Sequence, residues 1–358
     1  MDLEREWRGG QSQALLTLSG LRERGHDVEL ISARDSPLEL RSAQAGIPVY
    51  TVARVGLRGW AAAGINTLLA QKNFDLVHLN EPHALTAAWL AHAHKKLPLL
   101  LSRRIGFPLK KSWVSRKRYA AIERFVANSK NVAQSLIDCG IAAERISIVN
   151  EGVEIPALPS PERRNSARSY CGVKEGEFLF GCVSVFVPEK GQRHLIEALA
   201  TVRKSRPEAR LLLAGDGQCR REVEALAKQL RQSEAVLFPG FVNDVAKVYE
   251  ALDAFVFPSE FEGLGTALQS AMAAGLPSIS TNRGALAEVV DPERTALVVE
   301  PDGKEFAAAM MRVMTDAGLR KKLSESGRRE AQERFSAARM VDRTIQVYED
   351  VLRKRRAS

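Results

Sequence analysis

The sequence predicts an α/β protein with two doubly wound domains, each a parallel sheet covered by helices. Short runs of β-branched and other apolar residues alternate with segments of helical periodicity along most of the 358 residues, as in parallel sheets with crossover helices. A proline-rich and charged stretch at 156–165 interrupts the alternation and predicts a linker. A chain of this length can hold two domains with separate cores.

The alternation predicts six strands in each half of the chain. A helix over 11–24 ends at Gly25, because glycine favours the left-handed conformation that closes helices. The final segment, 337–355, is a basic amphipathic helix that we expect to pack on the first domain. The first domain is therefore placed at 1–158 with helix 337–358, and the second at 159–336. The strands are expected at 28–32, 49–52, 76–79, 97–102, 125–128, 146–149, 178–185, 211–214, 236–238, 254–257, 278–280 and 297–299.

The start of the chain departs from this pattern. The glycine pair Gly9-Gly10 should follow an apolar strand, yet only Met1, Leu3 and Trp7 are apolar before it. The first strand is central in the usual strand order, so its loss would expose both neighbours. We expect either a short or missing first strand or a native start a few residues upstream.

Composition and charge narrow the class of protein. A hydrophobic content of 45% with 27% charged residues is typical of a soluble globular protein. The chain contains no run of 18 apolar residues, so no membrane span is predicted. The acidic, polar N-terminus does not predict a signal peptide. The four cysteines lack metal-ligand spacing, which favours reduced thiols in the cytoplasm.

Part of the net charge of +9 is concentrated in one segment. Residues 103–119 contain seven basic residues and no acidic one, interleaved with Phe107, Trp113 and Tyr119. A solvated loop would explain this composition. An anionic membrane surface would also explain it, with the rings at the headgroup level. Nucleic acid is the weaker alternative, because no recognised binding motif accompanies the cluster.

The most informative segment is the turn between the apolar strand 254–257 and an alanine-rich helix. It contains Glu262, Gly263, Leu264 and Gly265. Free backbone N–H groups at a helix start can hold a phosphate, and a carboxylate accepts hydrogen bonds from hydroxyls. The turn therefore predicts a site for a sugar nucleotide.

Three other positions are weaker candidates for the same site. Lys190 follows a strand of the second domain, where it could neutralise a diphosphate or simply be solvated. Gly10 could let the backbone approach an anion, although glycine pairs are common in ordinary loops. Gly215 lies in another strand-to-helix turn and is expected to shape the same crevice.

In this order the motifs resemble the retaining glycosyltransferases of family 4, which have the GT-B architecture of two Rossmann-like domains facing a cleft. The resemblance covers nearly the whole chain, and 254–277 is its most specific part. It rests on the segments 8–11, 24–28, 75–78, 127–129, 188–191, 214–217 and 262–265.

The resemblance implies a role for each candidate residue. Glu262 would bind the donor sugar hydroxyls, and Gly10 would approach the diphosphate. Thr266 and Ala267, at the helix start, would hold the distal phosphate with help from Lys190. The backbone N–H groups facing sugar and phosphate would be those of Gly263, Leu264 and Gly265. Members of this fold generally need no metal and no cofactor besides the nucleoside-diphosphate sugar, and the chain contains no Asp-x-Asp pair.

Three positions depart from the family pattern. Ser270 stands where a second glutamate usually holds the donor ribose, so it offers a hydroxyl and no carboxylate. Val185 replaces an arginine that usually pairs with the diphosphate. No histidine follows the fourth strand, which leaves Arg104 or His83 as candidates near the anomeric carbon, with an ordinary loop histidine as the alternative for His83.

The sequence therefore predicts a cytoplasmic, metal-independent, retaining glycosyltransferase with Glu262, His83 and Arg104 as candidate catalytic residues. The basic segment 103–119 favours a lipid-linked or lipopolysaccharide acceptor at the inner membrane face, in cell-envelope glycan synthesis, and no nucleic-acid partner. Two alternatives remain: a sugar-nucleotide 2-epimerase of the same architecture, and a non-catalytic sugar-nucleotide-binding subunit.

Overall fold

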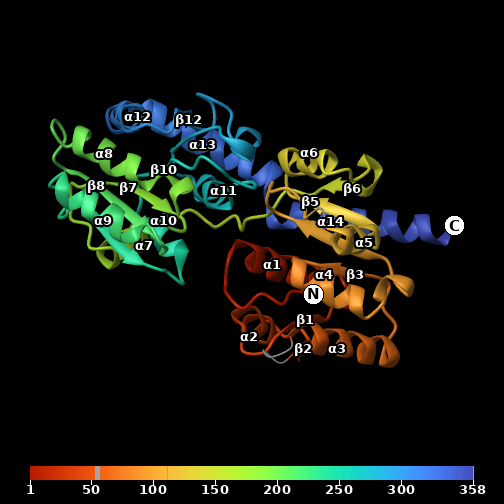
Figure 1. Cartoon of the computed structure of the whole chain (residues 1–358). Coiled ribbons are helices and arrows are strands. Elements are labelled where there is room, and N and C mark those ends of the chain that lie inside the picture. Colours follow the sequence, from red (N-terminus) through yellow and green to blue (C-terminus); the bar gives the residue numbers. More distant parts are fainter. Residues whose placement is uncertain (53–56, 111, 358) are drawn as a thin grey trace. The chain divides into compact units, whose positions relative to one another are not determined.

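The computed structural model describes residues 1–52, 57–110 and 112–357 (Figure 1). The chain divides into two compact units. Unit 1 comprises Met1–Gly152 and Ala337–Ser358, and unit 2 comprises Val153–Ser336. The division precedes the expected boundary at 158/159, because the N–H of Val153 donates to the carbonyl of Phe335 (2.8 Å) and thereby ties the following residues to unit 2.

Unit 1 contains two parallel sheets, one of two strands and one of four. The four-stranded sheet has the order β3-β4-β5-β6, and its strands follow one another in the chain. All six strands overlap the predicted segments, so the α/β fold class is confirmed for this unit. They are β1 (Leu30–Ala33), β2 (Val49–Val52), β3 (Val77–Leu79), β4 (Leu99–Arg103), β5 (Arg124–Ala127) and β6 (Ile146–Ile148).

The first three residues lie between β1 and β3, where the sequence predicts a short first strand. The N–H of Asp2 donates to the carbonyl of Ile31 (3.0 Å), and the N–H of Asn80 donates to the carbonyl of Met1 (3.0 Å). Leu3 is only 1% exposed. These residues join the two sheets of unit 1 through an isolated bridge and not through a regular strand.

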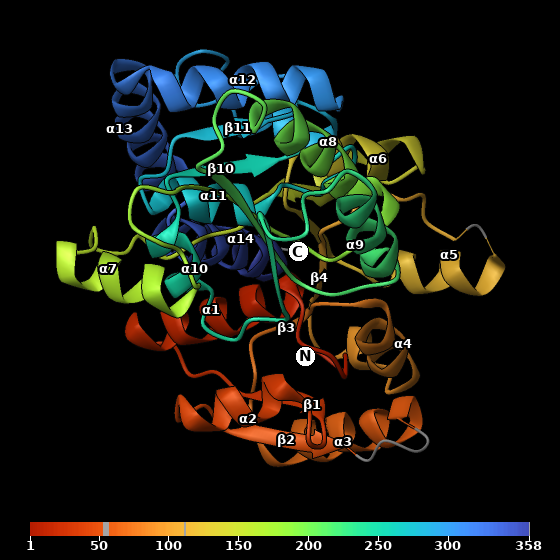
Figure 2. The same ribbon diagram turned by 90° about the vertical axis from the view of Figure 1, so that its left-hand side faces the viewer.

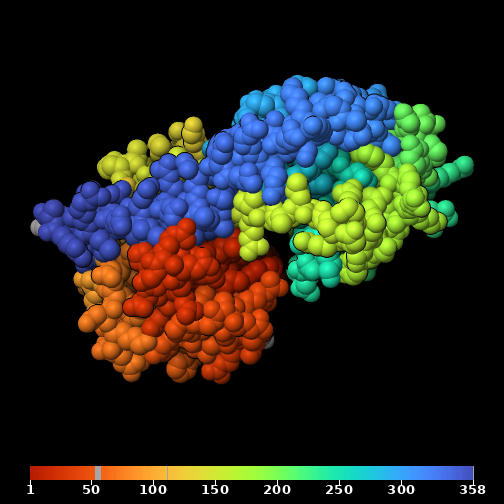
Figure 3. Space-filling view, turned by 180° about the vertical axis from the view of Figure 1, so that it is seen from behind, coloured from red at the N-terminus to blue at the C-terminus, as the bar shows by residue number. Residues whose placement is uncertain are grey.

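The last helix of the chain, α14 (Ala337–Arg356), packs on α1 (Gly9–Glu23), as Figure 3 shows for the blue and red segments. Val341 is buried against Gly20, and Arg24 forms an ion pair with Asp342 (2.7 Å). This helix is therefore part of unit 1. The other helices of unit 1 are α2 (Pro37–Gln44), α3 (Leu57–Gln71), α4 (Pro82–Leu90), η1 (Ala93–Lys95), α5 (Trp113–Ala120), α6 (Lys130–Asp138) and η2 (Ala143–Arg145).

Unit 2 contains one parallel sheet of six strands in the order β12-β11-β10-β7-β8-β9. The order reverses direction at β7, which is the arrangement of a doubly wound sheet and puts a crevice at the carboxyl ends of the strands. Every strand again overlaps a predicted one. They are β7 (Phe178–Val183), β8 (Ala209–Ala214), β9 (Val236–Gly240), β10 (Ala254–Phe257), β11 (Ser278–Ser280) and β12 (Leu297–Val298).

Helices cover this sheet. α8 packs on α12 and α11 packs on α13, and Figure 2 shows α8 beside α12. The apolar faces of these helices and the sheet form the larger hydrophobic core of the protein. The helices are η3 (Pro188–Lys190), α8 (Gln192–Val202), α9 (Arg220–Gln229), α10 (Val245–Ala251), α11 (Thr266–Ala273), η4 (Gly284–Glu288), α12 (Gly303–Thr315) and α13 (Ala317–Arg334).

The linker predicted at 156–165 is wrong in its second half, which begins helix α7 (Pro161–Tyr170). The Ser160 hydroxyl accepts the N–H of Arg163, and Pro161 occupies the first helical position, where its missing N–H costs nothing. The charged residues that suggested a linker hold the helix in place. Arg164 and Arg168 both pair with Asp253 (2.6 and 2.8 Å).

A half-buried histidine joins α14 to the sheet of unit 1. His78 Nδ1 lies 2.6 Å from the Tyr348 hydroxyl, and its Nε2 lies 2.8 Å from the Ser102 hydroxyl. Burial, together with the positive charges of the Met1 ammonium and of Arg104, lowers the pKa of His78 to about 3. The imidazole is therefore neutral at physiological pH and bridges two hydroxyl groups.

We predict that His78 makes a contribution to the stability of unit 1 that is lost as the pH falls from 6.5 toward 3. In that window the unfolded chain binds a proton at His78 that the folded protein excludes, so stability decreases by about 1.4 kcal/mol per pH unit for this group. All four tryptophans lie in unit 1, so urea unfolding followed by tryptophan fluorescence reports on this unit. The variant His78→Gln should show a shallower pH dependence, and an unchanged slope would contradict the prediction.

Candidate functional site

The carboxyl edge of the sheet in unit 2 brings the second-domain candidates together. The N–H of Ser184 donates to the carbonyl of Ala214 (3.0 Å), and the N–H of Gly215 donates to that of Gly240 (2.8 Å). The ends of β7, β8 and β9 therefore lie in one row. A Cβ on Gly215 would lie 2.0 Å from the carbonyl oxygen of Ser184, so only glycine allows this close approach.

The turn after β10 begins helix α11. Gly265 precedes the first helical residue with a φ of 81°, and a Cβ there would lie 2.5 Å from Leu286 Cδ2. Leu264 is buried and anchors the turn, whereas Gly263 is half-buried. The backbone at this turn is thus fixed in a left-handed conformation that glycine adopts without strain.

Helix α11 presents its N-terminus at this turn. The N–H groups of Leu268 and Gln269 donate back to the carbonyl of Gly265 (3.0 and 3.2 Å). Thr266 and Ala267 stand before them, at helix positions whose N–H groups have no intrahelical acceptor. Such groups, together with the helix dipole, attract an anion.

Lys190 and Glu262 form a largely buried ion pair beside the turn. Lys190 Nζ donates to Glu262 Oε1 and also to the carbonyl of Phe261 (3.4 Å). The two charged side chains are only 17% and 12% exposed. The N–H of Glu260 donates to the carbonyl of Glu189 (2.8 Å), which joins η3 to the same turn. The structure therefore places both predicted residues in one site and pairs them with each other.

Two positions that depart from the family pattern lie in this unit. Ser270 is half-buried on α11 and hydrogen-bonds the buried hydroxyl of Tyr249, which also donates to the carbonyl of Ala267 (3.1 Å). Val185 follows β7 and is 50% exposed, so it adds an apolar surface at the carboxyl edge. The ribose contact predicted for Ser270 stays a prediction.

In unit 1 the structure brings Gly10 and Arg104 together. A Cβ on Gly10 would lie 3.8 Å from Arg104 Cδ. The Arg104 guanidinium donates to the carbonyl and the side-chain oxygen of Asn80 (3.2 and 3.1 Å), and its Nε lies 3.2 Å from Glu151 Oε1. No pattern in the sequence predicts Asn80 and Glu151 as partners of Arg104.

His83 lies at the start of α4 with a different partner. Arg58 Nε and one terminal nitrogen of its guanidinium lie 3.0 and 2.7 Å from His83 Nδ1. Burial lowers the pKa of His83, and the charge of Arg58 lowers it further. The N–H of His83 donates to Glu81, which caps the helix. Arg58 was not predicted, because nothing in the local sequence of α3 signals a contact with α4.

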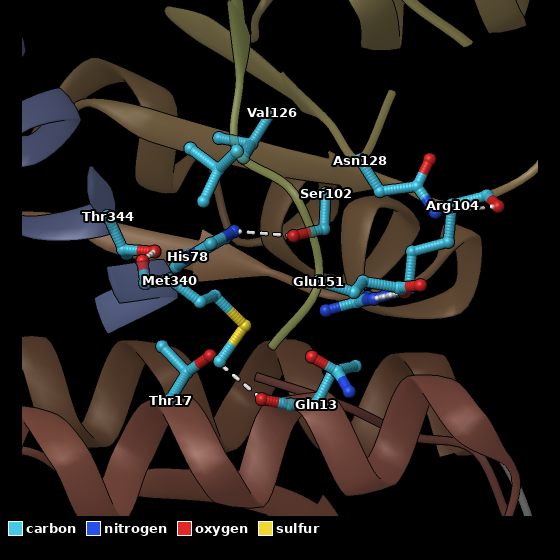
Figure 4. Close-up of a pocket in the computed structure, with 11 residues that line it drawn as sticks. Gln13, Thr17, His78, Ser102, Arg104, Val126, Asn128, Glu151, Met340 and Thr344 are labelled. Atoms are coloured by element: carbon cyan, nitrogen blue, oxygen red, sulfur yellow. Dashed lines mark hydrogen bonds and ion pairs between the residues drawn. The ribbon is translucent and has the colours of Figure 1, made fainter. Parts of the chain in front are cut away.

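A polar hollow of about 30 Å³ lies between the sheet of unit 1 and helices α1 and α14 (Figure 4). This volume admits roughly one or two water molecules. Asn128 Oδ1 is buried in the hollow's lining and has no hydrogen-bond partner within the described ranges. The lining residues are Gln13, Thr17, His78, Ser102, Arg104, Val126, Asn128, Val149, Glu151, Met340 and Thr344.

Two features are absent from the residues that the structure describes. No helix there is both long enough and apolar enough to cross a membrane. No group of three or more His, Cys, Asp or Glu side chains is arranged there to hold a metal ion.

Each half of the chain matches the model of a glycosyltransferase family. Residues 7–155 match the model described as Glycosyltransferase Family 4, and residues 164–330 match Glycosyl transferases group 1. The putative glycosyltransferase YtcC of Bacillus subtilis is 26% identical over 352 residues, which is 91% of this chain and 84% of the relative.

Other relatives match a smaller part. The uncharacterized glycosyltransferase MJ1607 of Methanocaldococcus jannaschii is 29% identical over 211 residues, or 57% of this chain. The putative glycosyltransferase EpsD of Bacillus subtilis is 33% identical over 190 residues, or 53% of this chain. The chain spans about half the length of these two relatives, 54% and 50%.

Solved structures show the same fold. Alr3699/HepE of Anabaena, in complex with UDP and glucose, matches with a TM-score of 0.85 and 21% identity over 97% of this chain and 98% of that chain. A glycosyltransferase from Rickettsia africae matches with the same score and identity over 98% and 97%. The predicted GT-B fold is confirmed by these matches. With both halves matched to glycosyltransferase models, the chain belongs to the glycosyltransferases of the family 4 type.

Proposed function

We propose that the protein is a retaining, metal-independent glycosyltransferase that moves a sugar from a nucleoside-diphosphate sugar to an acceptor hydroxyl. The observation that carries this proposal is the Lys190–Glu262 ion pair beside the Gly263–Gly265 turn and the N-terminus of α11. One place thus combines a hydroxyl-binding carboxylate, a cation and free backbone N–H groups. Several fold neighbours were solved with UDP, which supports a nucleotide-sugar donor.

The proposed chemistry relies on stabilising the leaving diphosphate. As the bond between the sugar and the diphosphate breaks, negative charge develops on the phosphate oxygens. The ammonium of Lys190 and the N–H groups at Thr266 and Ala267 would stabilise that charge, which is the role a metal ion has in other transferases. Glu262 would hold the sugar hydroxyls, so that the acceptor attacks the face from which the diphosphate leaves.

Unit 1 would bind the acceptor. Gly10 and Arg104 lie together at the carboxyl edge of its sheets, and Arg104 is held by Asn80 and Glu151. We assign Arg104 and His83 as the residues nearest the reacting sugar. Because the relatives of this chain are named as glycosyltransferases, neither the epimerase nor the non-catalytic subunit is favoured.

A basic and aromatic surface on unit 1 supports an acceptor carried by an anionic membrane. Phe107 is 53% exposed and Trp113 is 68% exposed, and Lys117 Nζ lies 3.9 Å from the Trp113 ring centre. Lys111 of the same segment lies outside the described residues. We propose that 103–119 rests on the inner face of the membrane, where envelope or lipopolysaccharide acceptors would be reached. One relative is named as a phosphatidylinositol monomannoside mannosyltransferase, 29% identical over 196 residues.

Removing one partner of the buried ion pair should destabilise unit 2 as well as abolish turnover. Lys190→Met or Glu262→Gln leaves an uncompensated buried charge, which costs about 3–5 kcal/mol. The double variant removes both charges and should recover most of the stability. Its hydrolysis of the donor should remain lower by about 10²–10³-fold. Thermal unfolding and donor hydrolysis measure the two effects separately, and near-normal hydrolysis in the double variant would overturn the proposed site.

The stereochemical outcome can be measured without knowing the acceptor. A thermal-shift screen of UDP- and GDP-sugars identifies a donor, and proton NMR then records the anomer that slow hydrolysis releases first. We expect the configuration of the donor to be retained and the rate to be unchanged by EDTA. An inverted sugar or a metal requirement would contradict the mechanism, whereas binding without any hydrolysis would favour the non-catalytic alternative.

Membrane association should depend on anionic lipid and on the basic segment. At low salt the protein should co-sediment with phosphatidylglycerol-containing vesicles more than with pure phosphatidylcholine vesicles, because exposed charges are screened as salt increases. Lys110→Glu with Lys117→Glu should abolish the difference. Lys95→Glu with Lys96→Glu makes the same charge change elsewhere on unit 1. Equal recovery with both lipids, or equal loss in both double variants, would count against this surface.

A further inference from the structure

Four chain segments of unit 1 each follow a strand or strand-like stretch. Residues 4–8 follow the strand-like start of the chain, α3 follows β2, α4 follows β3, and residues 104–110 follow β4. Because parallel strands end at the same edge, these segments lie where open α/β sheets bind ligands. Arg58 on α3 contacts His83 on α4, and the positive charges of Arg5 and Lys110 also act on His83. Arg5, Arg58, His83 and Lys110 are called the cluster below.

The contact between Arg58 and His83 fixes the tautomer of the histidine. A guanidinium has only N–H donors, so His83 Nδ1, at 3.0 and 2.7 Å from two nitrogens of Arg58, accepts a hydrogen bond. The proton of the neutral ring therefore resides on Nε2. The cluster offers the Nε2–H of His83 as a further donor and has no acceptor left on the ring.

Two of these basic side chains, Arg58 and Lys110, are considered first. Within the described ranges no acidic side chain forms an ion pair with Arg58 or Lys110. Of the groups that affect His83, Arg58, Arg5 and Lys110 are cationic, and Glu4 is the acidic one among them. The carboxylate of Glu81 accepts the backbone N–H groups of His83, Ala84 and Leu3.

We propose that Arg58, His83 and Lys110 bind an anionic oxygen group, a phosphate or a carboxylate, that belongs to the acceptor. A set of donors without acceptors selects a group that has only acceptor oxygens, and charged donors bind such a group most strongly. The inference rests on the proposed function in one respect, namely that unit 1 binds the acceptor.

The distribution of charge over the chain agrees with this site. Unit 1 has 27 basic and 17 acidic side chains, a net charge of +10, whereas unit 2 has 25 basic and 26 acidic ones, a net charge of −1. The excess positive charge of the protein is therefore on the unit that would receive the acceptor. Such a field raises the association rate of an anionic ligand.

The experiment follows the imidazole signals of the full-length protein by NMR. His83 is identified by the signal that is lost in His83→Gln, and its titration is recorded in chloride, in inorganic phosphate and in acetate at equal ionic strength. A bound anion should raise the pKa of His83 by about one unit, because it favours the protonated ring. A pKa shift in phosphate alone identifies phosphate as the preferred anion. A shift in acetate as well shows that the site also accepts a carboxylate.

The variant Arg58→Gln should weaken the anion response about tenfold, whereas Lys95→Gln, the same charge change outside the cluster, should leave it intact. Identical titrations in all three anions, or equal responses in both variants, would overturn the proposal. The test requires no transfer activity. Donor hydrolysis that remains intact in a protein without an anion response would refute this site alone and leave the proposed function standing.

Discussion

The ion pair between Lys190 and Glu262 is the interaction on which the candidate donor site depends. Each charge is buried to a degree that would be unfavourable without the other, since the cost of desolvating an isolated ion is several kcal/mol. The pair also joins two segments that are 72 residues apart, η3 and the turn before α11. The positions of the backbone N–H groups that would face a diphosphate are therefore fixed by the same contact that holds the cation and the carboxylate.

An analogous arrangement of side chains orders the carboxyl edge in unit 1. His78 on β3 contacts Ser102 on β4, and two residues further along each strand Asn80 contacts Arg104. Residues two apart in a strand point to the same face, so the two contacts form successive rungs between neighbouring strands. Tyr348 adds the last helix to the first rung. Arg104 therefore lies one rung beyond the contact that joins the last helix to the sheet.

Much of the fold could be predicted from sequence because the signals are local. Apolar runs predicted the twelve strands found among the described residues, and the turn with Glu262 could be recognised because its residues are adjacent. The contacts of Arg58 with His83 and of Arg104 with Glu151 join separate segments, so no local sequence pattern predicts them. The start of α7 was predicted to be a linker because its sequence is rich in charged residues. The ion pairs of Arg164 and Arg168 with Asp253 join segments that are far apart in the sequence.

The division of charge between the units suggests two modes of recognition in the proposed function. Unit 2 has almost no net charge, so a donor diphosphate would be recognised through short-range geometry: one lysine, a helix N-terminus and glycine turns. Unit 1 has a net charge of +10, and its field extends over about one Debye length, roughly 8–10 Å at physiological salt. A small soluble donor needs a site of fixed shape. An anionic acceptor, whether on a membrane or free, is first attracted by long-range charge and then selected by the few donors at the edge of the sheets.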